Sequence, residues 1–119
     1  MKTCMAFQDD GFFDFERLDA YRLARLHLGH VLDLTAASSA KDHLDRAAES
    51  VLLNIAEGSG KPKGSADRRK FYCIALGSAK ECACAWTLLC MRGRVDEQLA
   101  RRARAVLLRI VAMLSRMSA

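Results

Sequence analysis

The 119-residue chain has room for one domain with one hydrophobic core, since domains typically have about 100–150 residues. One proline and a 7% aromatic share exclude a β-sandwich or β-barrel, which would need many turn, β-branched and aromatic residues. The net charge of +5 is unevenly divided: residues 1–60 hold 6 Lys and Arg against 10 Asp and Glu, whereas residues 61–119 hold 13 against 4. This asymmetry indicates a polyanion-binding half or two complementary surfaces in an assembly; the alternative is a basic face that is merely solvated.

The N-terminal residues lack the unbroken apolar run of a signal peptide, and no window approaches the roughly 18 apolar residues of a membrane span. Four of the five cysteines fall in one apolar segment, so we expect free, buried thiols in a reducing compartment. The chain is therefore expected to be cytoplasmic, without a membrane partner.

Apolar periodicity predicts an all-α domain over residues 14–117, after a loosely ordered leader at residues 1–13. The first helix should begin at Asp14 and bury a stripe from Tyr21 to Thr35. A second apolar face on this helix predicts contact with another subunit. Its residues are Leu23, Leu26, His30 and Leu34.

Three further helices follow. The second should be capped by Ser38 or its neighbour and end at Gly58, a glycine suited to the position after a helix. Ser65 should cap the third helix, which runs to about Met91, and Asp96 should cap the fourth. Short connections predict an antiparallel up-down-up-down four-helix bundle. The apolar faces are wider than one small bundle needs, which predicts a homo-oligomer.

Basic residues concentrate around the loop before the third helix and along the fourth helix. Lysines, arginines and free backbone amides at a helix start suit phosphate binding. The predicted nucleic-acid-binding residues are Lys61, Lys63, Arg68, Arg69, Lys70, Arg101, Arg102 and Arg104. No aromatic residues alternate with the arginines of the fourth helix, so we expect contact with the RNA or DNA backbone rather than base stacking. The alternatives are a solvated loop and, for the fourth helix, a solvated or inter-subunit arginine face.

Several catalytic and metal patterns are not met. The loop is no P-loop, because a helix precedes it and Pro62 follows Lys61. The Glu-x-x-His pairs of di-iron bundles are missing, and Cys82 and Cys84 lack zinc or redox spacing. His27 and His30 are expected to be surface or interface residues. We therefore expect no metal, no cofactor and no catalytic residue.

A polar row runs along the second helix and has one counterpart on the third. Its members are Arg46, Ser50, Asn54, Glu57 and Glu81. They suit an acid–base site, but no nucleophile or histidine joins them. A buried network of hydrogen bonds and ion pairs that fixes helix register is the favoured interpretation, because unpaired buried polar groups are costly. The chain is therefore not expected to be an enzyme.

The segments RAAESVLLNIAEG (residues 46–58) and FYCIALGSAKE (residues 71–81), with LDAY at residues 18–21, carry a family resemblance. The chain resembles the 23S ribosomal RNA intervening-sequence proteins, often called four-helix bundle proteins, over about residues 14–115. That family includes the accessory variability determinant of diversity-generating retroelements. The resemblance implies a four-helix bundle, a ring-like homopentamer and no known catalytic activity. In the retroelement branch it also implies binding of nucleic acid and of a reverse transcriptase through basic surfaces.

The chain departs from this pattern near the start of the second helix. Many members have Gln and Arg where this chain has His43 and Asp45, and the proline that often precedes the helix is missing. These changes remove positive charge, so RNA contact is not expected at that point.

Overall fold

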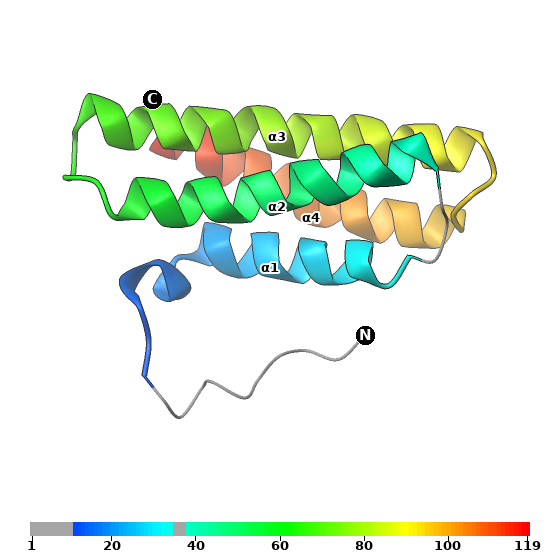
Figure 1. The fold of residues 1–119 in the computed structure, drawn as a ribbon, viewed down its shortest axis with the longest axis horizontal. Helices are drawn as coiled ribbons and strands as arrows, with labels where there is room; N and C mark the ends of the chain where they lie inside the picture. Colours follow the sequence, from blue (N-terminus) through cyan, green and yellow to red (C-terminus); the bar gives the residue numbers. More distant parts are fainter. Residues whose placement is uncertain (1–10, 35–37) are drawn as a thin grey trace.

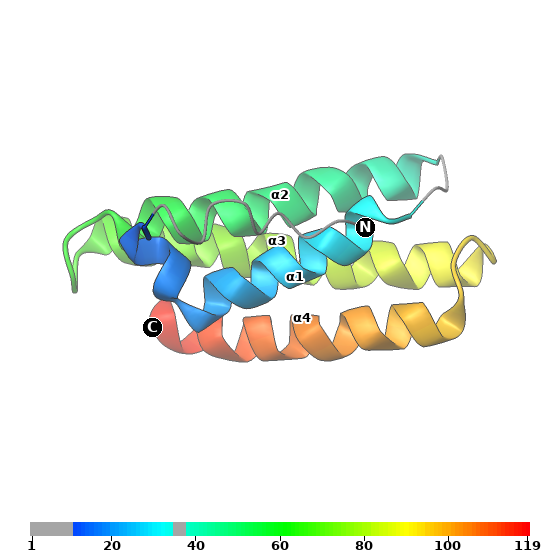
Figure 2. The same cartoon turned by 90° about the horizontal axis from the view of Figure 1, so that it is seen from below.

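The computed structural model describes residues 11–34 and 38–119, which form a four-helix bundle. Its elements are η2 (Asp14–Arg17), α1 (Asp19–Leu32), α2 (Ser39–Ser59), α3 (Ala66–Met91) and α4 (Glu97–Met117). Each helix runs antiparallel to the next, and α1 packs on both α2 and α4 (Figure 1). Turning the molecule shows the C-terminus at the same end of the bundle as the α2–α3 loop (Figure 2). The predicted all-α bundle class is confirmed.

Local capping chemistry sets two helix starts where they were predicted. The Ser38 hydroxyl accepts a hydrogen bond from the Lys41 amide at 3.2 Å, and the Ser65 hydroxyl accepts one from the Arg68 amide at 3.1 Å. Asp96 holds the N-cap position of α4, but its side chain makes no capping bond.

The first α-helix begins later than predicted. Asp14 opens the short 3-10 helix η2, and Leu18 is extended before α1 starts at Asp19. The Glu16 carboxylate accepts a hydrogen bond from the Phe13 amide at 2.9 Å, which closes this turn locally. Phe15 packs edge-on against the Tyr21 ring at 4.9 Å. These contacts bend the chain before α1.

Gly58 lies inside α2 instead of ending it, since the helix continues to Ser59. A Cβ added at Gly58 would lie 2.7 Å from Tyr72 Cε1 and 3.2 Å from Phe71 Cβ. The glycine is therefore required by the close approach of α2 and α3, a packing constraint that replaces its predicted role as a helix terminator.

A buried polar pair crosses the core from α1 to α3. Trp86 Nε1 donates a hydrogen bond to His27 Nε2 at 2.9 Å, and the two side chains are almost fully buried. Burial, with a smaller contribution from His30, lowers the pKa of His27 to about 4. His27 is thus a neutral core residue, and its predicted place at the surface or at an interface is wrong.

The cysteines described by the structure are free, but they are not all buried. Cys82 lies in the core, where burial raises the pKa of its thiol to about 12, whereas Cys90 is half-buried. Cys73 and Cys84 are exposed, which corrects the prediction of a buried set. Cys4 lies outside the described residues.

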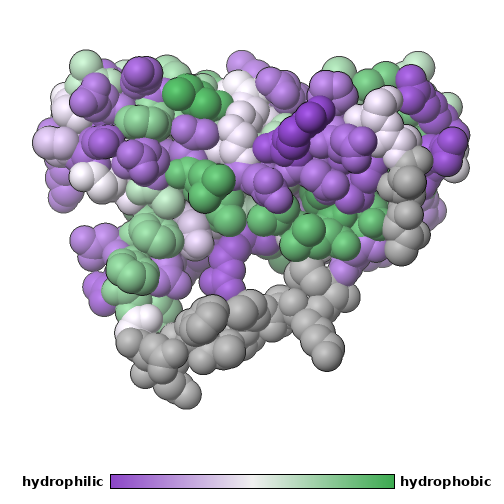
Figure 3. All heavy atoms as spheres, in the orientation of Figure 1, coloured by the Kyte–Doolittle hydropathy of each residue, from purple (hydrophilic) through white to green (hydrophobic). Residues whose placement is uncertain are grey.

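One side of α3 stays open although this is the most apolar segment. Exposed residues recur there at helical spacing, including Ile74, Gly77, Cys84, Leu88 and Met91. By length and composition α3 is apolar enough to cross a membrane, contrary to the prediction, and only 33% of its most apolar window is buried. In the face shown in Figure 3, small hydrophobic areas lie among hydrophilic ones over α3 and α2, and a broader hydrophobic area lies lower, toward α1. The bundle therefore leaves apolar surface on α3 without a partner in the single chain.

Candidate nucleic-acid interface

Basic side chains from three segments meet at the end of the bundle that carries the α2–α3 loop. Cys73 Sγ in α3 lies 4.0 Å from the Ser118 carbonyl oxygen, which places the end of α4 beside the first turns of α3. Arg116 is thereby brought to the same end as the loop. We call this group the loop-end patch; it consists of Lys61, Lys63, Arg68, Arg69, Lys70 and Arg116.

Three members of the loop-end patch hold the loop in shape. Arg69 Nη1 donates to the Gly64 carbonyl oxygen at 2.7 Å, and Arg68 Nε donates to the Tyr72 hydroxyl at 3.2 Å. Lys61 Nζ lies 3.4 Å from a Glu57 carboxylate oxygen and 5.4 Å from the centre of the Phe71 ring. Gly64 has a φ of 74°, a conformation suited to glycine. The loop is therefore anchored by its own cations.

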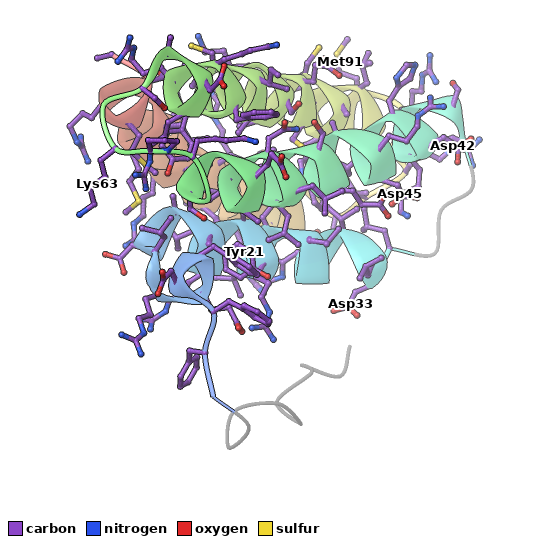
Figure 4. The ribbon with its side chains drawn as sticks, turned by 60° about the vertical axis from the view of Figure 1, so that its left-hand side comes forward. Tyr21, Asp33, Asp42, Asp45, Lys63 and Met91 are labelled. Atoms are coloured by element: carbon purple, nitrogen blue, oxygen red, sulfur yellow. The ribbon has the colours of Figure 1, made fainter. Side chains whose placement is uncertain are left out.

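The other three members are available for a ligand. Lys63, Lys70 and Arg116 are exposed, and none forms an ion pair or hydrogen bond within the described part of the chain. Figure 4 shows the Lys63 side chain extending outward from the loop. Asp67 adds one carboxylate in the first turn of α3, where the helix dipole favours it. The patch remains net positive at a helix start, which suits phosphate groups.

The predicted arginines of α4 do not join this patch. Arg101 and Arg102 lie near the start of α4, which follows the far end of α3, and α3 spans on the order of 40 Å for its 26 residues. Arg101 Nη2 bonds a Glu97 carboxylate oxygen at 2.8 Å, and this hydrogen bond raises the pKa of Arg101. The eight predicted residues therefore form two separate regions.

Arg104 lies beside a depression between α3 and α4. One hollow there has a volume of about 310 Å³ and an apolar floor that includes Ala83, Trp86 and Leu107. A smaller hollow of about 190 Å³ shares Ala83, Arg104 and Leu107 with it and adds Lys80 and Leu108. Because the two share these residues, we treat them as one α3–α4 groove with an apolar floor and a basic rim.

The predicted polar row is only partly brought together. Ser50 Oγ and Ser78 Oγ are hydrogen-bonded at 2.8 Å across α2 and α3, and Asn54 Nδ2 donates to the Ser50 carbonyl oxygen at 2.8 Å. Within a single chain the expected buried network is limited to these three residues. The other members, Arg46, Glu57 and Glu81, are exposed. None of those three lines the α3–α4 groove.

Most of the α1 side chains that were predicted to contact another subunit pack within the bundle itself. Leu23 and Leu34 pack against the core, and His30 is half-buried. Leu26 is the most open of the four, at 47% exposure. The helix is rotated relative to the predicted stripe, so that His27 faces the core.

The start of α2, where RNA contact was not expected, carries a local ion pair. Lys41 Nζ lies 2.6 Å from Asp45 Oδ1, and the Lys41 side chain is largely buried. Figure 4 places Asp42 and Asp45 at the opposite end of α2 from Lys63. Asp45 thus neutralises the Lys41 cation at the start of α2.

A metal centre is not assembled by the side chains that the structure describes. No group of three His, Cys, Asp or Glu residues there is close enough to hold an ion. His27, the most buried histidine, uses Nε2 to accept the Trp86 hydrogen bond.

The fold and this site define a small four-helix-bundle protein with one strongly basic end. Residues 16–116 match the family model of the 23S rRNA-intervening sequence protein, and the chain belongs to that family. The match starts within η2 and ends in the last turn of α4, so it covers all four helices. No curated protein matches the chain at a significant level.

Sequence reasoning missed the grouping of Arg116 with the loop and the His27–Trp86 pair. The position of Arg116 could have been predicted from the antiparallel connections, because they place the end of the fourth helix beside the start of the third. The spacing of Ala20, Ala24, His27 and Val31 carries the signal for a buried histidine, but its partner lies 59 residues away in sequence.

Proposed function

We propose that this chain is a non-catalytic, homo-oligomeric RNA-binding accessory protein that contacts the phosphate backbone through the loop-end patch. The family description, a protein associated with an intervening sequence of 23S rRNA, supports RNA as the nucleic acid. A pentameric ring is the assembly that the resemblance implies.

The observation that carries the proposal is the set of unpaired cations at the loop end. Lys63, Lys70 and Arg116 come from the loop, α3 and α4, yet all three are exposed at one end of the bundle. The anchored loop and the packing of α3 against α4 fix the backbone positions from which these charged side chains extend. Lysine and arginine in such an arrangement can neutralise neighbouring phosphates of a folded RNA.

The aromatic residues near the patch argue against base stacking as the main contact. Tyr72 is 3% exposed and bonded to Arg68, and the Phe71 ring is covered by Lys61. Neither ring is available as an open platform for a base. Binding should therefore follow the shape and charge of the RNA, with weak sequence preference.

The open side of α3 supports the proposed self-association. Leu88 and Ile74 are about 40% exposed, at 39% and 42%, and Met91 is 78% exposed. Adding Leu53 of α2, at 66%, gives an exposed apolar surface on two adjacent helices. Burial against further copies would remove this surface from water.

Binding of a fluorescein-labelled RNA hairpin, followed by anisotropy at several salt concentrations, tests the RNA contact. We expect tight binding at low salt and a steep loss of affinity as salt releases the phosphate counterions. A DNA hairpin of the same sequence is the matched ligand control. Absence of RNA binding at low salt would overturn the proposal, and light-scattering chromatography of the same sample reports its oligomeric state.

A structural or adaptor oligomer that binds a protein instead of RNA is the second candidate. The apolar floor of the α3–α4 groove favours it, because such a surface fits side chains better than phosphates. An oligomer without RNA affinity at low salt would select this alternative.

A further inference from the structure

The α3–α4 groove is placed and lined as a receptor for a short acidic and aromatic segment. Its floor includes Trp86, which is held by the hydrogen bond to His27. On its rim, Arg101 is already paired with Glu97, whereas Arg104 and Lys80 make no ion pair with any described residue. The groove therefore offers apolar area together with two uncompensated cations.

A segment with the opposite properties precedes α1 in the same chain. Residues 9–16 contain four carboxylates, three phenylalanines and no lysine or arginine. Within it, Phe12 is 53% exposed and Phe13 is 71% exposed. Phe13 stacks on Phe15 at a centroid distance of 5.6 Å, and Asp14 is exposed beside it. Residues 11–16 thus present aromatic rings and negative charge on one projection of the surface.

The chain does not fill its own groove in this arrangement. The 3-10 helix η2 contacts α1 and α2 and touches neither α3 nor α4. The wider part of the groove, around Thr87, Met91 and Glu97, lies at the far end of the bundle from η2 (Figures 1 and 2). A projection and a receptor on opposite ends of one molecule produce a head-to-tail contact between copies, and such contacts close into rings when the rotation permits.

We propose that the Phe12–Phe13 rings of one copy occupy the α3–α4 groove of the next, with Asp14 beside Arg104 and Lys80. This inference rests on the proposed self-association and names a contact within it. Two buried phenylalanines would supply the apolar area, since aromatic side chains bury about 150–250 Å² each. The carboxylate would neutralise rim cations and set the direction of insertion.

Photocrosslinking of the full chain tests this contact. Phe13 is replaced by benzoylphenylalanine, and unlabelled variant is mixed with ¹⁵N-labelled wild-type protein before irradiation. We expect crosslinks between subunits that map to the peptides around Ala83–Met91 and Arg101–Leu108. Crosslinks that map only to α1 or α2, or that form only within one subunit, would overturn the inference.

A charge exchange measured by light-scattering chromatography gives a second test. We expect Arg104→Glu and Asp14→Arg each to raise the dissociation constant of the assembly by about tenfold, and the double variant to recover most of the loss. Arg109→Glu is the matched control, because Arg109 is exposed on α4 and lines neither hollow. Equal weakening by Arg104→Glu and Arg109→Glu, or no recovery in the double variant, would contradict the contact.

The same chromatography distinguishes failure of the proposed assembly from failure of the Phe12–Phe13 contact alone. A wild-type chain that is monomeric at all concentrations removes both the proposed assembly and this contact. A wild-type oligomer that is unchanged in Phe13→Ser and Arg104→Glu removes only the contact and leaves the assembly to the open side of α3. Circular dichroism of each variant excludes loss of the fold as the cause.

Discussion

The loop-end patch and the α3–α4 groove are both basic, but their positive charges have different neighbours. At the loop end, Lys63, Lys70 and Arg116 are exposed at the end of the bundle where α3 begins. At the groove, Arg104 and Lys80 border an apolar floor. A phosphate backbone gains little from an apolar floor, whereas a phenylalanine ring gains from its burial there. Charge count alone therefore does not define a nucleic-acid surface; the groups beside each cation decide what it can bind.

Reversing the free charges of the loop-end patch should give the largest effect. The variant Lys63→Glu, Lys70→Glu and Arg116→Glu should bind the RNA hairpin about a thousandfold more weakly, since three phosphate contacts become repulsive. Anisotropy titration at constant salt measures this loss. The matched variant Arg101→Glu, Arg102→Glu and Arg109→Glu carries the same charge change on α4 and should retain most of the affinity. Equal losses in the two variants would remove the distinction between the regions.

Unlike the loop end, the α3–α4 groove contains Trp86, whose side chain is hydrogen-bonded to the buried His27. This buried histidine predicts that the stability of the fold depends on pH. The folded chain holds the pKa of His27 at about 4, below the ordinary value of 6.5. Between these two pH values the unfolded state therefore binds more protons than the folded state. The contribution of neutral His27 to the free energy of unfolding is complete above about pH 6.5 and is lost as the pH falls toward 4. The shift corresponds to about 3 kcal/mol.

Urea unfolding measured from about pH 7 down to about pH 4 tests this contribution. His27→Gln keeps an acceptor for the Trp86 N–H and removes the titrating group. We expect its free energy of unfolding to depend less steeply on pH than that of the wild type. Parallel curves for the two proteins would show that His27 is not the group responsible.

Alanine substitutions at Gly58 in α2 and at Gly77 in α3 should change the stability of the fold in opposite directions. Gly58→Ala should destabilise the fold by about 1–3 kcal/mol, because its Cβ would meet the Tyr72 ring at 2.7 Å. It should also weaken RNA binding, since it separates the helix ends that carry the patch. Thermal unfolding and anisotropy measure the two consequences. A fully stable Gly58→Ala would contradict the close approach of the helices.

Gly77→Ala should give the smallest effect and the opposite sign. A Cβ added at Gly77, in the middle of α3, would have no atom within 4 Å apart from those of its chain neighbours and the local helix backbone. Alanine should therefore stabilise the helix by about 0.5–1 kcal/mol without changing RNA affinity. Thermal unfolding of dilute protein measures the gain. Destabilisation of dilute protein would contradict the open space beside Gly77.

Local sequence signals predicted the helices well because capping is a short-range interaction. Ser38 and Ser65 each bond an amide three residues ahead, so both helix starts could be read from neighbouring residues. Neighbouring residues do not predict the roles of Gly58 and His27, because these roles depend on contacts with Tyr72 and Trp86 of another helix. Periodicity gives the face of a helix but not the identity of its partner.

The candidate site was predicted in composition but not in arrangement. The basic loop residues were identified from charge density, whereas their separation from the α4 arginines follows from the length of α3. The polar row was expected to be buried as a unit, yet only Ser50 bonds Ser78 of α3, and Asn54 bonds Ser50 within α2. Longer charged side chains at the same spacing extend to the surface instead.

Crosslinking of bound RNA tests most directly whether the loop end, and not α4, contacts the phosphate backbone. A hairpin that contains thiouridine is irradiated in complex with the wild-type chain, and the modified peptides are identified by mass spectrometry. The account predicts adducts in the segments 59–71 and 113–119. Adducts confined to the segment 97–109, with the loop unmodified, would contradict it.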